Sequence, residues 1–271
     1  MSSINSITPE KLSRLVGTPK SPRILDVRVD EDYTADPRLI PGSIRVNASP
    51  PINGVNLYDR PVVVVCHRGA RISHGFAAYL RDEHVQADVM EGGFAAWRDA
   101  KLPLLVTGKL PKRDDRNRTH WVTRERPKVD RIACPWLIKR FVDPHAVFMF
   151  VKPSEVIAVG ERYGAAPFDV EDVFWGHRGE LCTFDVMLEE FGLQTEPLRR
   201  LAAMVRGADT ARLDLSPQAA GLLAASLGLS RMYPDDLEQL DAGMLLYDAF
   251  YRWCRDAIDE AHNWPSQKAK G

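Results

Sequence analysis

Cys66 and Arg71 are the residues whose types and spacing most directly suggest chemistry. They bound a short segment, residues 66–71, that follows directly on the apolar residues 61–65. A short loop after a buried strand can turn its main-chain N–H groups inward, where they bind an anion and favour a thiolate over a thiol. Gly69 permits the close main-chain turn that a Cβ would obstruct. The pattern predicts a nucleophilic Cys66, against the alternative of a buried structural cysteine at a strand end.

The other side chains of this loop each have two possible roles. Arg71 could lie near the bound anion and take part in catalysis, or it could be an exposed arginine at the start of the next helix. His67 and Arg68 could hold an oxyanion of the substrate, as arginine often does, or they could point to solvent. The main chain through Gly69 and Ala70 would complete the substrate-binding loop.

Alternating strands and helices are expected to position this loop. Residues 61–65 include four consecutive valines and are too apolar to face water on either side. Thr8 and Pro9 form a typical helix start, and Gly92 marks a tight turn. The predicted strands are residues 24–27, 44–46, 61–65 and 87–90, and the predicted helices are residues 9–16, 71–83 and 94–99. This alternation predicts an α/β domain over residues 1–107, in which a parallel sheet has helices on both faces.

The segment from residue 7 to residue 105 resembles a rhodanese domain, which is a sulfurtransferase module. The resemblance is carried by the Cys66 loop and by Leu25-Asp26-Val27-Arg28, Ile40-Pro41-Gly42-Ser43 and Gly92-Gly93-Phe94-Ala95-Ala96-Trp97 followed by Pro103. Four residues separate Cys66 from Arg71, which is the loop length of the sulfurtransferases, whereas the related tyrosine-type phosphatases have one residue more. The resemblance implies that Cys66 carries sulfur and that this domain requires no cofactor.

Rhodanese chemistry explains why these residue types occur in the loop. The resemblance implies that the Cys66 thiolate attacks the outer sulfur of a small anionic donor such as thiosulfate and releases sulfite. The resulting persulfide is an anion, so it needs oriented N–H donors in a site with little water. It then passes its sulfur to a thiol or protein acceptor. By the same resemblance Asp26 and Arg28 form a structural pair, and Trp97 is expected in the core.

Residues 108–120 are predicted to be a linker between two domains. The stretch is polar and charged, and basic residues outnumber acidic ones. A basic patch could bind an anion or nucleic acid, but a solvated linker is favoured because no aromatic residues are interleaved with the charges.

Residues 121–271 are predicted to form a second, mainly α-helical (α+β) domain. One strand is expected at residues 146–151. The predicted helices are residues 131–141, 153–163, 184–191 capped by Thr183, 195–205 ending before Gly207, 217–227 and 235–262. The strand implies a small sheet at the front of the helical part.

This second part resembles the chromate-resistance protein family, which includes the C-terminal domain of chromate-responsive regulators. The resemblance covers residues 121–264 and is strongest in residues 128–138, 177–185 and 206–209. It implies a physiological setting in chromate resistance but no mechanism.

Four residues of the second domain have side chains that commonly bind metals. They are His177, Glu180, Cys182 and Asp209, and together they could hold a metal or polarise a small anion. The alternative is that His177 and Glu180 are loop residues, Cys182 is a small buried side chain and Asp209 is a turn former. Asp130 and Arg131, next to Cys134, form a second candidate cluster.

Composition limits the remaining function classes. A chain of 271 residues with 27% charged residues and a net charge of -1 fits a two-domain globular protein, with no membrane role and no nucleic-acid partner expected. The four cysteines lie far apart without a CxxC pair, which argues against a zinc knuckle or a disulfide framework. Because no signal peptide or apolar membrane-spanning run is evident, we expect a cytoplasmic location.

These observations predict a sulfurtransferase that carries sulfane sulfur as a persulfide on Cys66 and acts in chromate or oxyanion stress. The competing hypothesis is a non-catalytic regulatory protein in which the loop senses an oxyanion such as chromate. A third hypothesis, chromate reduction by a thiolate, lacks a flavin or nicotinamide motif to support it.

Overall fold

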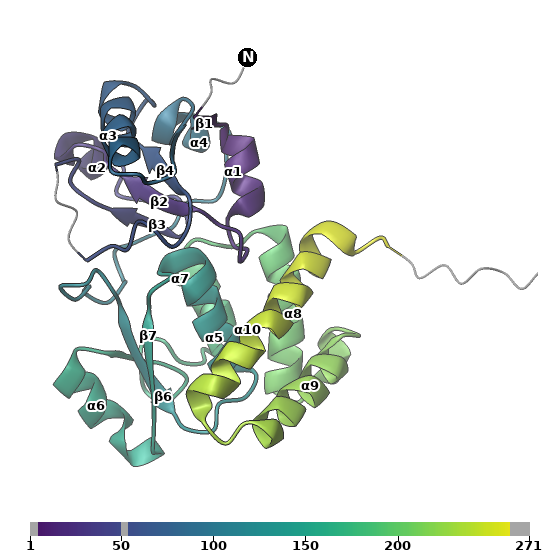
Figure 1. The fold of residues 1–271 in the computed structure, drawn as a ribbon. Coiled ribbons are helices and arrows are strands. Elements are labelled where there is room, and N and C mark those ends of the chain that lie inside the picture. The colour runs from purple at the N-terminus through teal and green to yellow at the C-terminus, as the bar shows by residue number, and fades with distance from the viewer. Residues whose placement is uncertain (1–4, 50–53, 261–271) are drawn as a thin grey trace, which may run out of the picture.

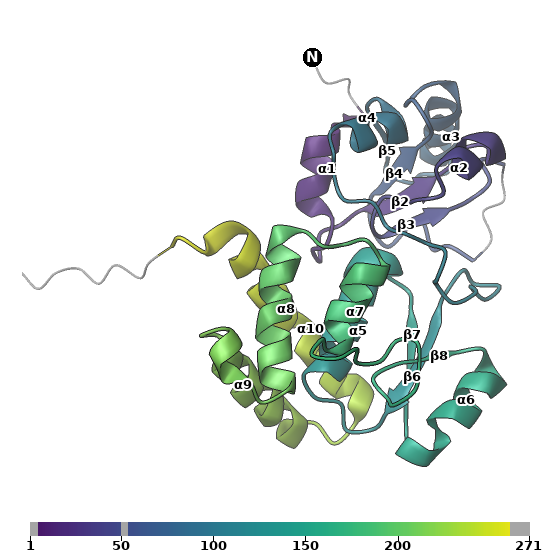
Figure 2. The same ribbon diagram turned by 180° about the vertical axis from the view of Figure 1, so that it is seen from behind.

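The computed structural model describes residues 5–49 and 54–260. An α/β domain at the N-terminus is packed against a larger, mainly helical domain (Figure 1), and the view from behind shows the same two bodies in contact (Figure 2). Within the described residues no helix is both long and apolar enough to cross a membrane.

The N-terminal domain is built on a five-stranded sheet in the order β1-β5-β4-β2-β3, and every neighbouring pair is parallel. The strands are β1 (Ser6–Ile7), β2 (Arg23–Asp26), β3 (Ser43–Arg45), β4 (Val62–Val65) and β5 (Ala87–Met90). The four valines of β4 are all buried at the centre of the sheet. The predicted parallel sheet is therefore confirmed, and the valine run explains its central strand.

Helices cover both faces of this sheet, as predicted. They are α1 (Pro9–Leu15), α2 (Asp30–Ala35), α3 (Arg71–Asp82) and α4 (Gly93–Asp99). Val63 shares a core cluster with Leu12 of α1 and Trp97 of α4, whereas the flanking valines of β4 share a second cluster with Phe76 and Leu80 of α3. Alternate residues of one strand thus face different helical layers, and Trp97 lies in the core as expected.

The second domain has a small parallel sheet in the order β7-β6-β8, with helices making up most of the rest. Its strands are β6 (His120–Arg124), β7 (Val147–Val151) and β8 (Ala166–Pro167). Its helices are α5 (Asp130–Leu137), α6 (Val156–Tyr163), α7 (Thr183–Glu190), α8 (Glu196–Asp209), α9 (Ala219–Met232) and α10 (Asp236–Arg252). Short 3-10 turns occupy Pro153–Glu155 and Leu213–Leu215, and π-helical turns at Ile138–Val142 and Trp253–Ala257 extend α5 and α10. The mainly helical class with a small sheet is confirmed.

Some predicted helix ends in this domain are wrong. Thr183 is the first residue of α7, and Cys182 takes the cap position. Gly207 lies inside α8, where a Cβ would be only 3.0 Å from the Cβ of Ala219 in α9. This glycine therefore serves close helix packing rather than helix termination. Helix α9 also continues five residues past its predicted end at residue 227, to Met232. The predicted end at His262 lies outside the described residues.

The two domains share one hydrophobic core cluster rather than meeting only through the predicted linker. The Phe141 ring occupies the space that a Cβ at Gly17 would need, and Gly17 has a positive φ of 76°. The Gly42 N–H donates to the Phe141 carbonyl at 2.6 Å. Within the stretch predicted as a linker, the Asp114 carboxylate pairs with the Arg118 guanidinium at 2.8 Å.

Candidate functional site

Cys66 follows the last residue of β4, at the carboxyl edge of the parallel sheet. Its Sγ lies 3.1 Å from the Ser73 hydroxyl and accepts the Ala70 N–H at 3.2 Å. The residue is 5% exposed. Ser73 lies in the first turn of α3, where the positive end of the helix dipole favours a negative charge. The sulfur is therefore held by one main-chain and one side-chain group at a helix N-terminus.

These contacts set the ionisation of the thiol. Burial on its own would raise the pKa of Cys66, but the Ser73 hydroxyl and the main-chain N–H groups of Ala70, Ser73 and Arg68 stabilise the thiolate. The result is a pKa below that of an ordinary cysteine. More of this thiol is consequently ionised at neutral pH, as a nucleophile requires.

The loop is held in shape by the start of α4. The Phe94 N–H donates to the Cys66 carbonyl at 2.9 Å, and the Ala95 N–H donates to the His67 carbonyl at 2.9 Å. A Cβ on Gly93 would collide with the Cys66 carbonyl and with the Arg68 amide. The two consecutive glycines that begin α4 therefore allow this helix to approach the loop.

Gly69 is also required for the close approach between the Cys66 loop and the start of α4. Its φ is 62°, and a Cβ there would lie 2.7 Å from the Met90 carbonyl and 2.8 Å from the Gly92 and Gly93 amides. Any larger residue would separate the loop from the end of β5 and disturb the donors around the sulfur.

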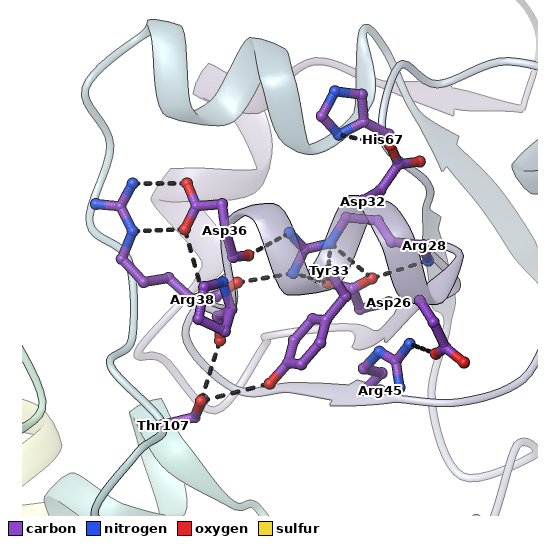
Figure 3. Close-up of polar contacts among 11 residues, drawn as sticks. Asp26, Arg28, Asp32, Tyr33, Asp36, Arg38, Arg45, His67 and Thr107 are labelled. Carbon is purple, nitrogen blue, oxygen red and sulfur yellow. Dashed lines mark hydrogen bonds and ion pairs between the residues drawn. The ribbon is translucent and has the colours of Figure 1, made fainter.

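The remaining loop residues are more open. Arg71 is the first residue of α3 and is exposed, as is Arg68, and neither side chain makes a hydrogen bond or ion pair within the described part of the chain. His67 is half-buried, and its Nδ1 lies 4.0 Å from the Asp32 carboxylate (Figure 3). The predicted catalytic role of Arg71 thus has no contact to support it in this structure, and its side chain is free to meet an incoming anion.

A cavity of about 640 Å³ lies at the same edge of the sheet. It is lined by the segments that follow β2 and β3 and by Ile72 of α3, the neighbour of Ser73. Arg45, Asp30 and Glu31 give it charges of both signs. The cavity therefore lies next to the first turn of α3, and none of residues 66–71 is among its lining residues.

Asp26, the last residue of β2, forms an ion pair with Arg28 at the carboxyl edge of the sheet (Figure 3). The Arg28 Nε donates to both Asp26 oxygens, at 3.0 and 2.8 Å, and both side chains are buried. The guanidinium also lies 3.7 Å from the ring centroid of Phe94, whose N–H holds the Cys66 carbonyl. The expected structural pair is therefore confirmed. Through the contact of Arg28 with Phe94 the pair supports α4, and α4 in turn holds the Cys66 loop.

Replacing Ser73 with alanine is expected to raise the pKa of Cys66, because the thiolate loses its strongest hydrogen-bond donor. The rate of iodoacetamide alkylation, followed from pH 5 to 10, should show its midpoint at higher pH in Ser73→Ala than in the wild type. Ser13→Ala, a serine in α1, is the matched control and should leave the midpoint unchanged. Equal midpoints for wild type and Ser73→Ala would contradict this assignment.

A second cluster of ionisable side chains lies in the helical domain. The His177 Nε2 is 3.3 Å from a carboxylate oxygen of Asp169, 3.3 Å from one of Asp209 and 3.6 Å from one of Asp130. One ligand atom each from Asp130, His177 and Asp209 lie within 4.8 Å of one another. We call Asp130, Asp169, His177 and Asp209 the His177 cluster.

Elements far apart in the sequence bring the His177 cluster together. Asp130 is the first residue of α5 and is fully buried, and its carboxylate accepts the N–H groups of Thr183 and Phe184 at 2.7 and 3.1 Å. Asp209 is the last residue of α8. His177 lies in the loop before α7. The N-terminus of α7 therefore holds the buried carboxylate that His177 approaches.

The charges in the His177 cluster depend on one another. Hydrogen bonds to the carboxylates of Asp130, Asp169 and Asp209 favour the protonated imidazole and raise the pKa of His177 to about 12. Burial raises the pKa of Asp130. In contrast, Asp169 has a lowered pKa, since His177, Arg131 and Arg124 together outweigh its burial.

Glu180 and Cys182 do not join this cluster, so their prediction as ligands is corrected. Glu180 has a side chain that is 86% exposed and pairs with Arg212 at 3.4 Å. Cys182 is buried, and its Sγ lies 3.2 Å from the Asp185 carboxylate. Burial raises the pKa of Cys182 well above its usual range, so the thiol stays protonated.

Asp169 was missed by sequence reasoning, and Asp130 was placed in a different candidate cluster. Asp169 lies in a loop with a φ of 50° and belongs to no recognisable motif. The Arg131 guanidinium lies 3.3 Å from the Asp169 carboxylate, which joins the two clusters that the sequence had left separate.

Comparison with known proteins defines the class of each domain. Residues 8–100 match a family model for the rhodanese-like domain, and residues 121–254 match a model described as ChrB, C-terminal domain. The chain therefore contains a rhodanese-like domain followed by a ChrB C-terminal domain. A curated relative, Protein ChrB of Cupriavidus metallidurans, is 32% identical over 173 residues, which cover 57% of this chain and 50% of the relative. The chain thus matches about half of that relative's length.

The solved structures that are similar to this chain include rhodanese-like proteins. A rhodanese-related protein from Thermoplasma volcanium is 21% identical, with 38% of this chain and 98% of that chain covered and a TM-score of 0.31. A rhodanese-like domain protein from Staphylococcus aureus is 28% identical, with 35% and 91% covered and a TM-score of 0.30. A thiosulfate sulfurtransferase from Pseudomonas aeruginosa is 23% identical, with 38% and 19% covered and a TM-score of 0.32.

Proposed function

We propose that this protein is a sulfurtransferase that carries sulfane sulfur as a persulfide on Cys66 and acts in chromate or oxyanion stress. The observation that carries the proposal is the environment of the Cys66 sulfur at the N-terminus of α3, where it accepts the Ala70 N–H at 3.2 Å and lies 3.1 Å from the Ser73 hydroxyl. The rhodanese-like domain supports the reaction class, and the ChrB C-terminal domain supports the physiological setting.

The reaction proceeds in two displacements at sulfur. The Cys66 thiolate attacks the outer sulfur of thiosulfate, the sulfur–sulfur bond of the donor breaks, and sulfite leaves with the electron pair. The product is a Cys66 persulfide anion. An acceptor thiolate or cyanide then attacks the terminal sulfur of the persulfide, and the Cys66 thiolate is the leaving group. No external oxidant or reductant is consumed.

The loop residues have separate tasks in this scheme. The inward N–H of Ala70 and the Ser73 hydroxyl stabilise the anion before and after sulfur is bound. Arg68 and Arg71 are exposed at the mouth, where they would attract the donor oxyanion. The cavity of about 640 Å³ beside Ile72 supports a small-molecule thiol or a protein cysteine as acceptor.

Turnover separates this proposal from the sensing hypothesis. The purified full chain is incubated with thiosulfate and cyanide, and thiocyanate is measured over many equivalents of protein. Multiple turnovers are expected for a sulfurtransferase. If instead thiosulfate or chromate binds and no thiocyanate forms beyond the uncatalysed rate, the regulatory alternative is favoured and the enzyme assignment fails.

We also propose that the His177 cluster binds a divalent transition metal. The Nε2 of His177 carries at most one hydrogen, yet three carboxylates approach within 3.6 Å of it. A metal ion accepts several oxygen ligands and one imidazole nitrogen at once, which is the donor set that Zn, Mn and Fe share. Asp169 and His177 also line a cavity of about 560 Å³, which gives an ion and a small anion access to the cluster.

Metal content of the full chain tests this second proposal. After incubation with Zn, Mn or Fe(II) and desalting, elemental analysis should find about one ion per chain in the wild type. The paired variant His177→Gln with Asp209→Asn should lose it. Glu180→Gln is the matched control, because Glu180 lies outside the cluster and should keep the ion. Wild-type protein that retains none of the three metals would contradict the proposal.

A further inference from the structure

A cavity of about 390 Å³ lies between the two domains, far along the sheet from Cys66. Its lining includes four cationic side chains: Arg23 and Arg60 come from the rhodanese-like domain, and Lys139 and Arg140 come from the helical domain. Arg23 begins β2, at the amino edge of the sheet, whereas Cys66 follows the carboxyl end of β4. The cavity is therefore separate from the persulfide site.

Arg23 is the feature that points to a ligand. Its side chain is only 2% exposed, and its Nε–H has no hydrogen-bond partner among the described residues. The other two nitrogens are engaged, one with the Asp59 carboxylate at 2.8 Å and one with the His145 ring. Burial of a guanidinium N–H without an acceptor is destabilising, because the group loses its hydrogen bonds to water and forms none within the protein. Arg23 also lines the cavity, so an anion bound there would lie beside this incompletely satisfied guanidinium.

The positive charges of the cavity are only partly neutralised. The Arg140 guanidinium pairs with Asp248 at 2.7 Å. In the described part of the chain no carboxylate pairs with Lys139, whose Nζ lies 5.9 Å from the ring centroid of Phe148. Among the described residues, Asp241 is the only acidic one in the lining itself.

The rhodanese side of the cavity is cationic as well. Asp59 is shared between Arg23 and Arg60, at 2.8 and 3.3 Å. His145 of the helical domain, whose ring contacts Arg23, adds no charge near neutral pH, because burial and the adjacent Arg23 lower its pKa. Because the Asp59 carboxylate is the partner of both Arg23 and Arg60, the rhodanese-like side of the cavity keeps an excess positive charge that can attract an anionic ligand.

We propose that this cavity binds a tetrahedral oxyanion of the phosphate or sulfate class, free or as the charged group of a small molecule. Arginine and lysine are the residues that bind such groups, through forked and point-charge contacts respectively. A volume of about 390 Å³ exceeds that of a bare oxyanion and falls in the range of small-molecule sites. Because both domains line the cavity, the ligand joins them and stabilises their contact.

Calorimetric titration of the full chain with inorganic phosphate and with ribose 5-phosphate tests the proposal. Both compounds carry the phosphate group. Tighter binding of ribose 5-phosphate than of inorganic phosphate would identify the ligand as an organic phosphate, whereas equal affinities would identify it as the free ion. Neutral ribose should not bind. Thermal unfolding should move to higher temperature with the bound ligand.

Variants locate the site. Arg60→Gln combined with Lys139→Gln removes two partly exposed cations without touching buried Arg23, and binding should weaken by about tenfold or more. Lys112→Gln, an exposed lysine elsewhere, should change binding by less than about twofold. Absence of saturable binding to the wild type would overturn the proposal. So would unchanged binding by the double variant, or binding that is lost instead in Arg68→Gln, since the anion would then lie on the Cys66 loop.

Discussion

Cys66→Ser is expected to lower the rate of thiocyanate formation from thiosulfate and cyanide by at least about 10³-fold. The serine hydroxyl does not ionise near neutral pH and cannot hold a sulfane sulfur as a persulfide. The main-chain donors around position 66 remain in place, because serine keeps the size of cysteine and the Ala70 N–H can still bond its oxygen. The loss of activity should therefore come without loss of fold, which circular dichroism and thermal unfolding will show.

Cys254→Ser is the control for this experiment. Cys254 is buried in the π-helical turn after α10, and burial raises its pKa to about 11. Its thiol is protonated and out of reach, so the variant should keep its sulfur-transfer activity even if it unfolds at a lower temperature. If Cys66→Ser retained activity, or Cys254→Ser lost it while still folded, Cys66 would not be the sulfur carrier.

Asp26→Ala should reduce the free energy of unfolding by about 3–5 kcal/mol. The substitution leaves the Arg28 guanidinium buried without its carboxylate, although Arg28 would still donate to the Asp36 and Arg38 carbonyls at 2.9 and 2.7 Å. Urea unfolding of the wild type and the variant, followed by circular dichroism, measures the difference.

The double variant Asp26→Leu with Arg28→Met isolates the cause of that loss. It removes both charges together, and apolar replacements of buried ion pairs are often close to neutral. The double variant should therefore be more stable than Asp26→Ala alone. A double variant that is equally or more destabilised than Asp26→Ala would show that the loss comes from the packing of Arg28 on Phe94 and not from an unpaired buried charge.

The rhodanese-like half could be predicted from sequence because its signals are local. The valine run gave the central strand, Thr8 and Pro9 gave the start of α1, and the Cys66 loop is one contiguous segment. Ser73 was missed although it lies only two residues beyond Arg71. Its position in the first turn of a helix, one turn from the loop, was the available signal, because such a hydroxyl can reach back to the preceding loop.

The His177 cluster could be predicted only in part because its members meet through tertiary packing. Asp130 and Asp209 are 79 positions apart in the sequence, and nothing local indicates that α5 and α8 meet. Glu180 was included because it follows His177 closely. The main-chain bonds between Arg178 and Leu181 close a tight turn that leaves Glu180 exposed and away from the cluster.

The contact between the domains was also beyond sequence reasoning. The charged stretch at residues 108–120 predicts a solvated linker, yet Asp114 fixes it by accepting hydrogen bonds from Arg116, Arg118 and His120. Gly17 follows the end of α1 with a positive φ of 76°. It also makes room for the Phe141 ring, a role that depends on a residue more than a hundred positions away.

Intact-mass analysis of the full chain after brief exposure to thiosulfate is the most direct measurement of the central claim. We predict that the wild type gains the mass of one sulfur atom, that peptide mapping places it on Cys66, and that cyanide removes it as thiocyanate. A chain that gains no sulfur, or gains it on Cys134, Cys182 or Cys254 instead, would contradict the proposed function.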